Sequence, residues 1–141
     1  MILKTNRLTY EIIGKSIEEG IACLVQHGAI LTSDDPIGTL TKRNLILSKE
    51  EFDRLNHILL SIKHDTFNYK DVVKLNIYVI GYHIVSTIYK TEGVLILDDW
   101  TIGLEYKRII KKYIEVCNMN NIPSGFTREV VEWIIDEKGQ C

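Results

Sequence analysis

The side chains best suited to chemistry form a cationic cluster in the second half of the chain. Its four basic residues share one side of an amphipathic segment: Lys107, Arg108, Lys111 and Lys112. Like charges four positions apart on a helix repel each other by about 0.2–0.5 kcal/mol. The cluster is typical of a solvated face, and the alternative is a site for phosphate or carboxylate groups. Trp100 and Tyr106 are aromatic neighbours of the cluster. We predict that these six residues contact a partner.

An acidic segment near the C-terminus is the alternative contact surface. Glu129, Glu132, Asp136 and Glu137 recur there between apolar positions. A basic partner would favour this segment over the cationic cluster, because complementary charges steer association. We therefore add Glu132 and Asp136 to the predicted partner-binding residues.

Asp98 and Asp99 are adjacent carboxylates that permit two interpretations. They could bind a divalent cation, which prefers oxygen ligands, or they could stabilise the start of the helix that follows. We favour the helix start, because one Asp-Asp pair is far from a complete ligand set.

The histidines and the known motifs give no catalytic site. His57 and His64 are seven residues apart on one helix face, a separation of about 10 Å that is too long for both to bind one zinc ion. The sequence contains no GxGxxG, GxxxxGK[ST], GxSxG or HExxH motif. We therefore predict no catalytic, cofactor-binding or metal-binding residues and no cofactor.

Four helices are predicted to position these residues, at about 17–27, 49–63, 103–117 and 128–137. Capping boxes at Ser16–Glu19 and Ser48–Glu51 mark the first two starts, and Gly28 marks a left-handed stop. Thr127 is the expected cap of the last helix. Residues 29–44 carry turn residues and are expected to form the longest loop. Leu8–Ile13 is predicted to be a short strand.

The apolar run from Val72 to Leu97 gives the strongest β signal. Apolar and polar residues alternate from Val72 to Val79, which is the strand period. Gly81-Tyr82 and Thr91–Gly93 suit tight turns. We therefore predict an antiparallel three-stranded meander over about 72–98, packed with the four helices in an α+β fold. The second sheet face is apolar, and either these helices or a partner would cover it.

Composition limits the classes of function. The chain has 141 residues and a formal net charge of −2, which predicts a single domain over 1–141 and argues against a nucleic-acid or membrane partner. Three widely spaced cysteines, Cys23, Cys117 and Cys141, indicate neither a disulfide framework nor a zinc site, and so favour the cytoplasm.

Small size, segregated charge and the lack of a catalytic motif together predict a protein that binds another protein. We expect an immunity-type inhibitor that neutralises a partner, such as a bacterial toxin domain, by occluding its surface. Two alternatives remain open. One is a metal-assisted nucleic-acid-processing module that uses Asp98, Asp99 and the basic helix, and the other is a small-ligand sensor.

Overall fold

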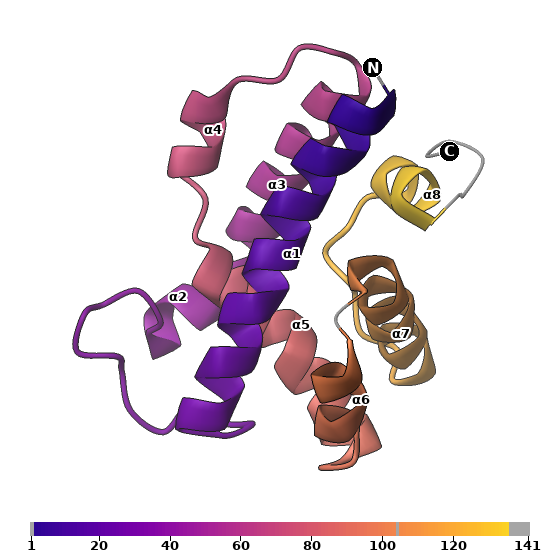
Figure 1. Cartoon of the computed structure of the whole chain (residues 1–141). Coiled ribbons are helices and arrows are strands. Elements are labelled where there is room, and N and C mark those ends of the chain that lie inside the picture. The colour runs from indigo at the N-terminus through magenta and orange to yellow at the C-terminus, as the bar shows by residue number, and fades with distance from the viewer. Residues whose placement is uncertain (1, 104, 136–141) are drawn as a thin grey trace.

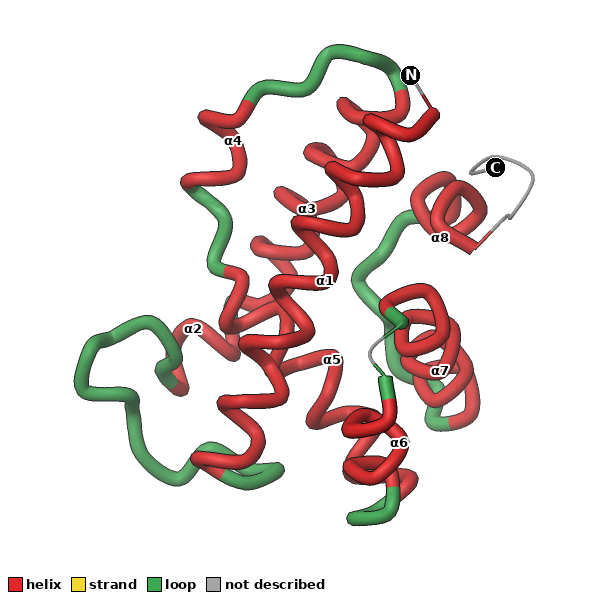
Figure 2. The backbone as a smooth tube through the Cα atoms, in the orientation of Figure 1, coloured by secondary structure: helices red, strands yellow, loops and turns green. Residues whose placement is uncertain are grey.

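Helices are the only regular secondary structure in the described part of the chain. The computed structural model describes residues 2–103 and 105–135, and within them Figure 2 shows helices and loops but no strand. The predicted α+β class and three-stranded meander are therefore wrong. Eight helices occur in the described residues (Figure 1): α1 (Ile2–His27), α2 (Lys42–Ile46), α3 (Ser48–Lys63), α4 (Tyr69–Val73), α5 (Ile77–Glu92), α6 (Ile96–Ile102), α7 (Tyr106–Met119) and α8 (Arg128–Ile135).

The predicted meander contains the end of α4, all of α5 and the start of α6. Burial along α5 follows the helical period, because Ile80, Ile84 and Ile88 are each at most 1% exposed. Val79 and Tyr82 are buried on another side of the same helix, in a second apolar cluster. A helix buried on several sides carries few polar residues, so its sequence resembles that of a buried strand. This ambiguity explains the wrong prediction.

Gly81 lies inside a helix crossing instead of a hairpin turn. A Cβ atom on Gly81 would overlap the carbonyl group of Ser16, and one on Gly20 would overlap the backbone of Gly81. Glycine therefore lets α1 and α5 approach backbone to backbone. Gly93 has the positive φ expected of it (83°), but it ends α5 as the C-cap instead of closing a β-turn.

The N-terminal strand and both capping boxes are also wrong. Leu8–Ile13 belongs to α1, which continues to His27, and the Ser16 hydroxyl donates to the Ile12 carbonyl within this helix at 2.8 Å. At the start of α3, Glu51 accepts a hydrogen bond from the Asn76 backbone N–H at 2.8 Å and pairs with Arg54. Glu51 therefore serves a contact with a distant segment, and Ser16 a bond inside its own helix, instead of local capping.

Three other predicted helices are found, with ends that differ by up to three residues. The helix predicted at 49–63 is α3 (Ser48–Lys63), and the one predicted at 103–117 corresponds to α7. α8 occupies 128–135 of the predicted 128–137, and Thr127 Oγ1 accepts from Val130 N–H at 3.3 Å, as a cap does. Gly28 has a φ of 80° after the last turn of α1.

The main core lies where α1, α3, α5, α7 and α8 meet. Each helix supplies at least one nearly inaccessible side chain, as listed: Ile13, Leu59, Ile80, Ile110 and Ile134. Packing of this apolar surface stabilises helices despite their many β-branched residues, since tertiary burial outweighs a small loss of helix propensity. None of the described helices is long and apolar enough to cross a bilayer.

Candidate functional site

A pocket of about 220 Å³ lies between α6 and α7, and its lining includes four of the predicted partner-binding residues: Trp100, Arg108, Lys111 and Lys112. Ile96, Trp100 and Ile109 are its apolar lining, and the Trp100 side chain is only 8% exposed. Charged side chains complete the lining, as listed: Asp99, Glu105, Arg108, Lys111, Lys112 and Glu115. The pocket is thus an apolar depression with charge of both signs around it.

Two cations of the pocket have no acidic partner. Among the described residues, neither Arg108 nor Lys111 forms an ion pair, and both are exposed. Lys112 instead lies 3.0 Å from Glu92 Oε1 and 3.8 Å from Glu115 Oε2. The hydrogen bond to Glu92 raises the pKa of Lys112, so this lysine stays charged. Arg108 and Lys111 are therefore the side chains that can bind an incoming acidic group.

The structure separates the remaining predicted contact residues from this pocket. Lys107 does not line the pocket, and Tyr106 is 7% exposed and packs edge-on against Tyr10, with ring centroids 5.3 Å apart. Burial raises the pKa of Tyr106. Glu132 lies on α8 and pairs with Arg128 at 3.0 Å, and Asp136 and Glu137 lie outside the described residues.

The acidic half of the pocket was missed as part of a site. The sequence pattern assigned Asp99 to a helix start and Ile96 to a strand, and Glu105 and Glu115 were not among the predicted contact residues. The helical period of α7 places Arg108, Lys112 and Glu115 on neighbouring turns. Their spacing in the sequence therefore indicated part of the pocket lining. Trp100 of α6 was predicted as a neighbour of the cluster, but α6 itself was missed, because residues 96–98 were assigned to a strand.

Asp98 and Asp99 lie in the first turn of α6, where negative charge interacts favourably with the helix dipole. They make no side-chain capping hydrogen bond, since the N-cap position is Leu95 and its side chain cannot accept one. No group of three or more His, Cys, Asp or Glu that could hold a metal ion occurs in residues 2–103 and 105–135. The metal site of the nucleic-acid-processing alternative therefore has no complete donor set in this region.

A second cleft, of about 330 Å³, lies between α3 and α4. Its lining is Asp53, Arg54, His57, Ile58, Asp71 and Lys74. Asp53 pairs with Lys49 at 3.3 Å and Arg54 pairs with Glu51, so half of the charged lining is already engaged. His57 is thus a cleft residue, separate from His64.

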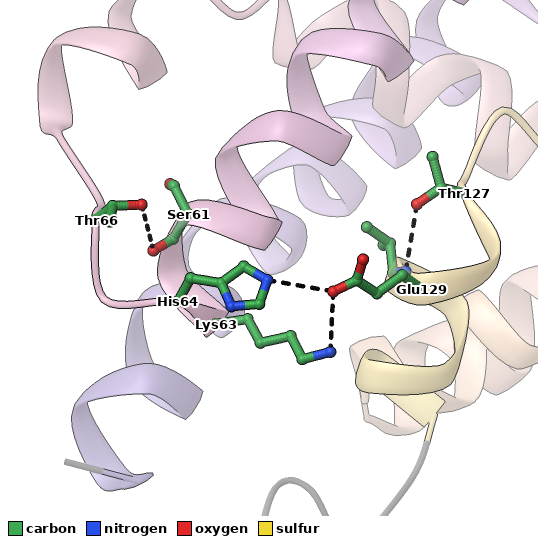
Figure 3. Close-up of polar contacts among 7 residues, drawn as sticks. Ser61, Lys63, His64, Thr66, Thr127 and Glu129 are labelled. Atoms are coloured by element: carbon green, nitrogen blue, oxygen red, sulfur yellow. Dashed lines mark hydrogen bonds and ion pairs between the residues drawn. The ribbon is translucent and has the colours of Figure 1, made fainter.

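His64 lies at the C-terminal end of α3 and contacts α8 (Figure 3). Its Nε2 is 3.2 Å from Glu129 Oε2, and Lys63 Nζ is 3.1 Å from the same oxygen. The hydrogen bond from Lys63, followed by that from His64, lowers the pKa of Glu129. This cluster connects two helices through one carboxylate oxygen.

His83 lies in an aromatic cluster under the loop between α7 and α8. Its ring centroid is 5.5 Å from that of Phe52 and 6.0 Å from that of Tyr113, and Phe126 contacts both of these rings. Burial, and then the charge of Lys90, lower the pKa of His83. The neutral imidazole therefore packs as an aromatic side chain.

Comparison with known proteins gives one match. The model of a family described as "Putative zinc dependent peptidase (DUF5700)" matches residues 1–122, which include α1 to α7 and the pocket between α6 and α7. No curated protein and no solved structure matches the chain significantly. Nothing in these comparisons supports the expected immunity or toxin-neutralising role.

Proposed function

The chain belongs to the DUF5700 family, and from that premise we propose that it is a helical domain that binds a polypeptide segment in the pocket between α6 and α7. The observation that carries the proposal is the position of Arg108 and Lys111, two exposed cations without an ion pair in the described residues, beside the buried ring of Trp100. Tryptophan and arginine are the residues most enriched where proteins bind polypeptides tightly.

The lining of the pocket agrees with a polypeptide ligand better than with a simple anion. It carries three basic and three acidic side chains around three apolar ones, so its formal charges cancel. A peptide can place an apolar side chain against Trp100 and an acidic side chain against Arg108 and Lys111. Its backbone N–H groups can donate to Asp99, Glu105 or Glu115. A polypeptide is also the ligand that a peptidase family handles. The unbridged Cys23 and Cys117 agree with action in the cytoplasm.

Tryptophan fluorescence tests this proposal directly. The chain has two tryptophans, so the variant Trp133→Phe leaves Trp100 as the only tryptophan reporter. We expect peptides with an apolar residue beside an acidic one to change Trp100 emission saturably. The double variant Arg108→Gln/Lys111→Gln should bind them about 5- to 10-fold more weakly, because two exposed charge contacts contribute roughly 1 kcal/mol in total.

Lys107→Gln is the matched control for this experiment. It removes one positive charge from the same helix, but Lys107 does not line the pocket. We expect the peptide affinity of Lys107→Gln to stay within about twofold of the parent, since salt screens charges that lie outside the pocket. Equal weakening by Lys107→Gln and by Arg108→Gln would contradict binding in the pocket and leave only a general charge effect.

Zinc-dependent peptide hydrolysis is the second candidate, and the family match is the observation that favours it. The assay is release of fragments from an unfolded protein such as casein, with zinc added and with a chelator. Hydrolysis that the chelator abolishes would establish this activity. Binding without hydrolysis would support the first candidate.

A further inference from the structure

We infer that the side chains of residues 2–103 and 105–135 do not by themselves form a catalytic zinc site, although the family of this chain is described as a zinc-dependent peptidase. A catalytic zinc ion needs three protein ligands that converge on one point, and the known arrangements include at least one histidine. All four histidines lie in the described residues. No three metal-binding side chains converge in that part of the chain.

Two of the histidines are committed to other contacts. His83 packs edge-on against the rings of Phe52 and Tyr113. His64 binds Glu129, and Glu129 binds Lys63 through the same oxygen. A cation bound to Glu129 would be repelled by the Lys63 ammonium group, which lies 3.1 Å from Glu129 Oε2.

His57 lies in the cleft between α3 and α4 with two carboxylates and two cations. Asp53 is paired with Lys49, and Arg54 and Lys74 add positive charge to the same cleft. His57 and His64 are also separated by about 10 Å along α3, at 1.5 Å per residue. These two histidines cannot ligate one ion.

The nearest approach to a donor set lies around the end of α1. Glu19, Cys23 and His27 follow one another at four-residue intervals, and Asp35 in the next loop is close enough to influence Cys23 and to be influenced by His27. Asp35 and Glu19 already bind other groups of the protein. Asp35 accepts from Ile37 N–H at 3.1 Å and from Thr39 Oγ1 at 2.9 Å.

Glu19 and Cys23 are also unsuited to zinc. Glu19 pairs with Lys15 at 3.2 Å. Burial raises the pKa of the Cys23 thiol, whereas zinc binds the thiolate. Any zinc ion that serves the family activity would therefore need at least one ligand from beyond the described residues.

The test is the zinc content of the full chain. The purified protein is stripped with a chelator, incubated with an excess of zinc chloride, passed over a gel-filtration column in metal-free buffer and analysed by elemental mass spectrometry. We expect far less than an equimolar amount of zinc, and the same low content in the double variant Cys23→Ser/His27→Gln. Retention of an equimolar amount by the parent chain overturns the inference. Loss of that zinc in the double variant would place the site at the end of α1.

A second measurement guards against slow loading of the site. Thermal unfolding with and without zinc should show no increase in melting temperature, because only an ion that binds the folded state stabilises it. A saturable increase that Cys23→Ser/His27→Gln removes would overturn the inference. Peptide binding in the pocket between α6 and α7 uses none of these side chains, so its success or failure is separate from this result.

Discussion

Gly20 of α1 lies directly against Gly81 of α5, and the two helix backbones touch there without an intervening side chain. These helices make the most extensive contact between two elements of the described fold, and Figure 1 shows α5 crossing the lower part of α1. The position of α5 relative to the rest of the core therefore depends on two residues that have no side chain.

The variant Gly81→Ala should destabilise the protein. A Cβ atom at this position would overlap the Ser16 carbonyl, so the helices must separate, and overpacking of this kind costs roughly 1–3 kcal/mol or more. Urea unfolding measures the change. Gly14→Ala is the control, because a Cβ there meets only the Tyr10 ring at 3.7 Å. It should raise stability by up to about 1 kcal/mol through helix propensity. Equal effects of both variants would contradict the close crossing.

Asn56 should be essential for the loop that leads into α8. Its Nδ2 donates to the Gly125 carbonyl at 2.8 Å, and its Oδ1 accepts from Thr127 N–H at 3.1 Å. The Asn56 side chain is buried and Asn56→Ala removes both hydrogen bonds, each of which contributes about 0.5–1.5 kcal/mol. Faster amide exchange at Thr127 would locate the effect.

The control for Asn56 is Asn118→Ala on α7, where the residue is exposed. That variant should change the free energy of unfolding by less than about 0.5 kcal/mol, as most surface substitutions do. If Asn56→Ala were equally mild, the bridge from α3 to the loop would not stabilise the fold.

Glu129→Gln should weaken the contact between α3 and α8 in a pH-dependent way. The pKa of Glu129 is lowered in the folded chain, by Lys63 first and then by His64, so the pairing stabilises the protein at pH values above about 4.3, the ordinary glutamate pKa. This stabilisation disappears as the pH falls through the lowered pKa. The stability difference between parent and variant should therefore be small at neutral pH and vanish in acid.

Glu132→Gln is the control for that experiment, because Glu132 contacts only Arg128 of its own helix in the described region. Thermal unfolding at neutral pH should show a smaller loss for Glu132→Gln than for Glu129→Gln. The opposite order would show that the cluster in Figure 3 does not connect the two helices energetically.

Acid should destabilise the aromatic cluster through His83. Its pKa is lowered in the folded protein, first by burial and then by Lys90, so the unfolded chain takes up a proton at a higher pH than the folded chain does. The stability that neutral His83 contributes is therefore fully present above about pH 6.5, the ordinary histidine pKa. It decreases as the pH falls toward the lowered pKa of His83 in the folded protein.

The variant His83→Phe tests this by keeping the ring contacts with Phe52 and Tyr113 while removing the titration. Its melting temperature should vary less with pH below about 6.5 than that of the parent. His57→Gln, in the cleft between α3 and α4, is the control and should keep the parent's pH dependence. A parallel decrease in the parent and in His83→Phe would assign the acid sensitivity to other groups.

The sequence alone determined the helices in which buried residues recur with the helical period on one face. In α3 and α7 the buried residues, such as Leu55, Leu59 and Ile110, recur every three or four positions opposite charged residues, so both helices could be predicted. The same period placed Arg108 and Lys111 on one side of the helix, which was predicted to be a contact surface. Gly28 and Thr127 were recognisable because they act on the backbone next to them.

Only the tertiary structure decided between strand and helix for residues 72–98, and with it the site. α5 is surrounded by α1, α3 and α7, so burial removed the polar positions that would have shown its period. Gly81 has a helical role because Gly20, distant in sequence, lies against it. The pocket likewise requires α6 beside α7, which places Trp100 and Asp99 next to Arg108, and no local spacing encodes that contact. Long-range packing outweighs local propensity here, because most of the stability of a helix in a protein comes from the apolar surface that it buries.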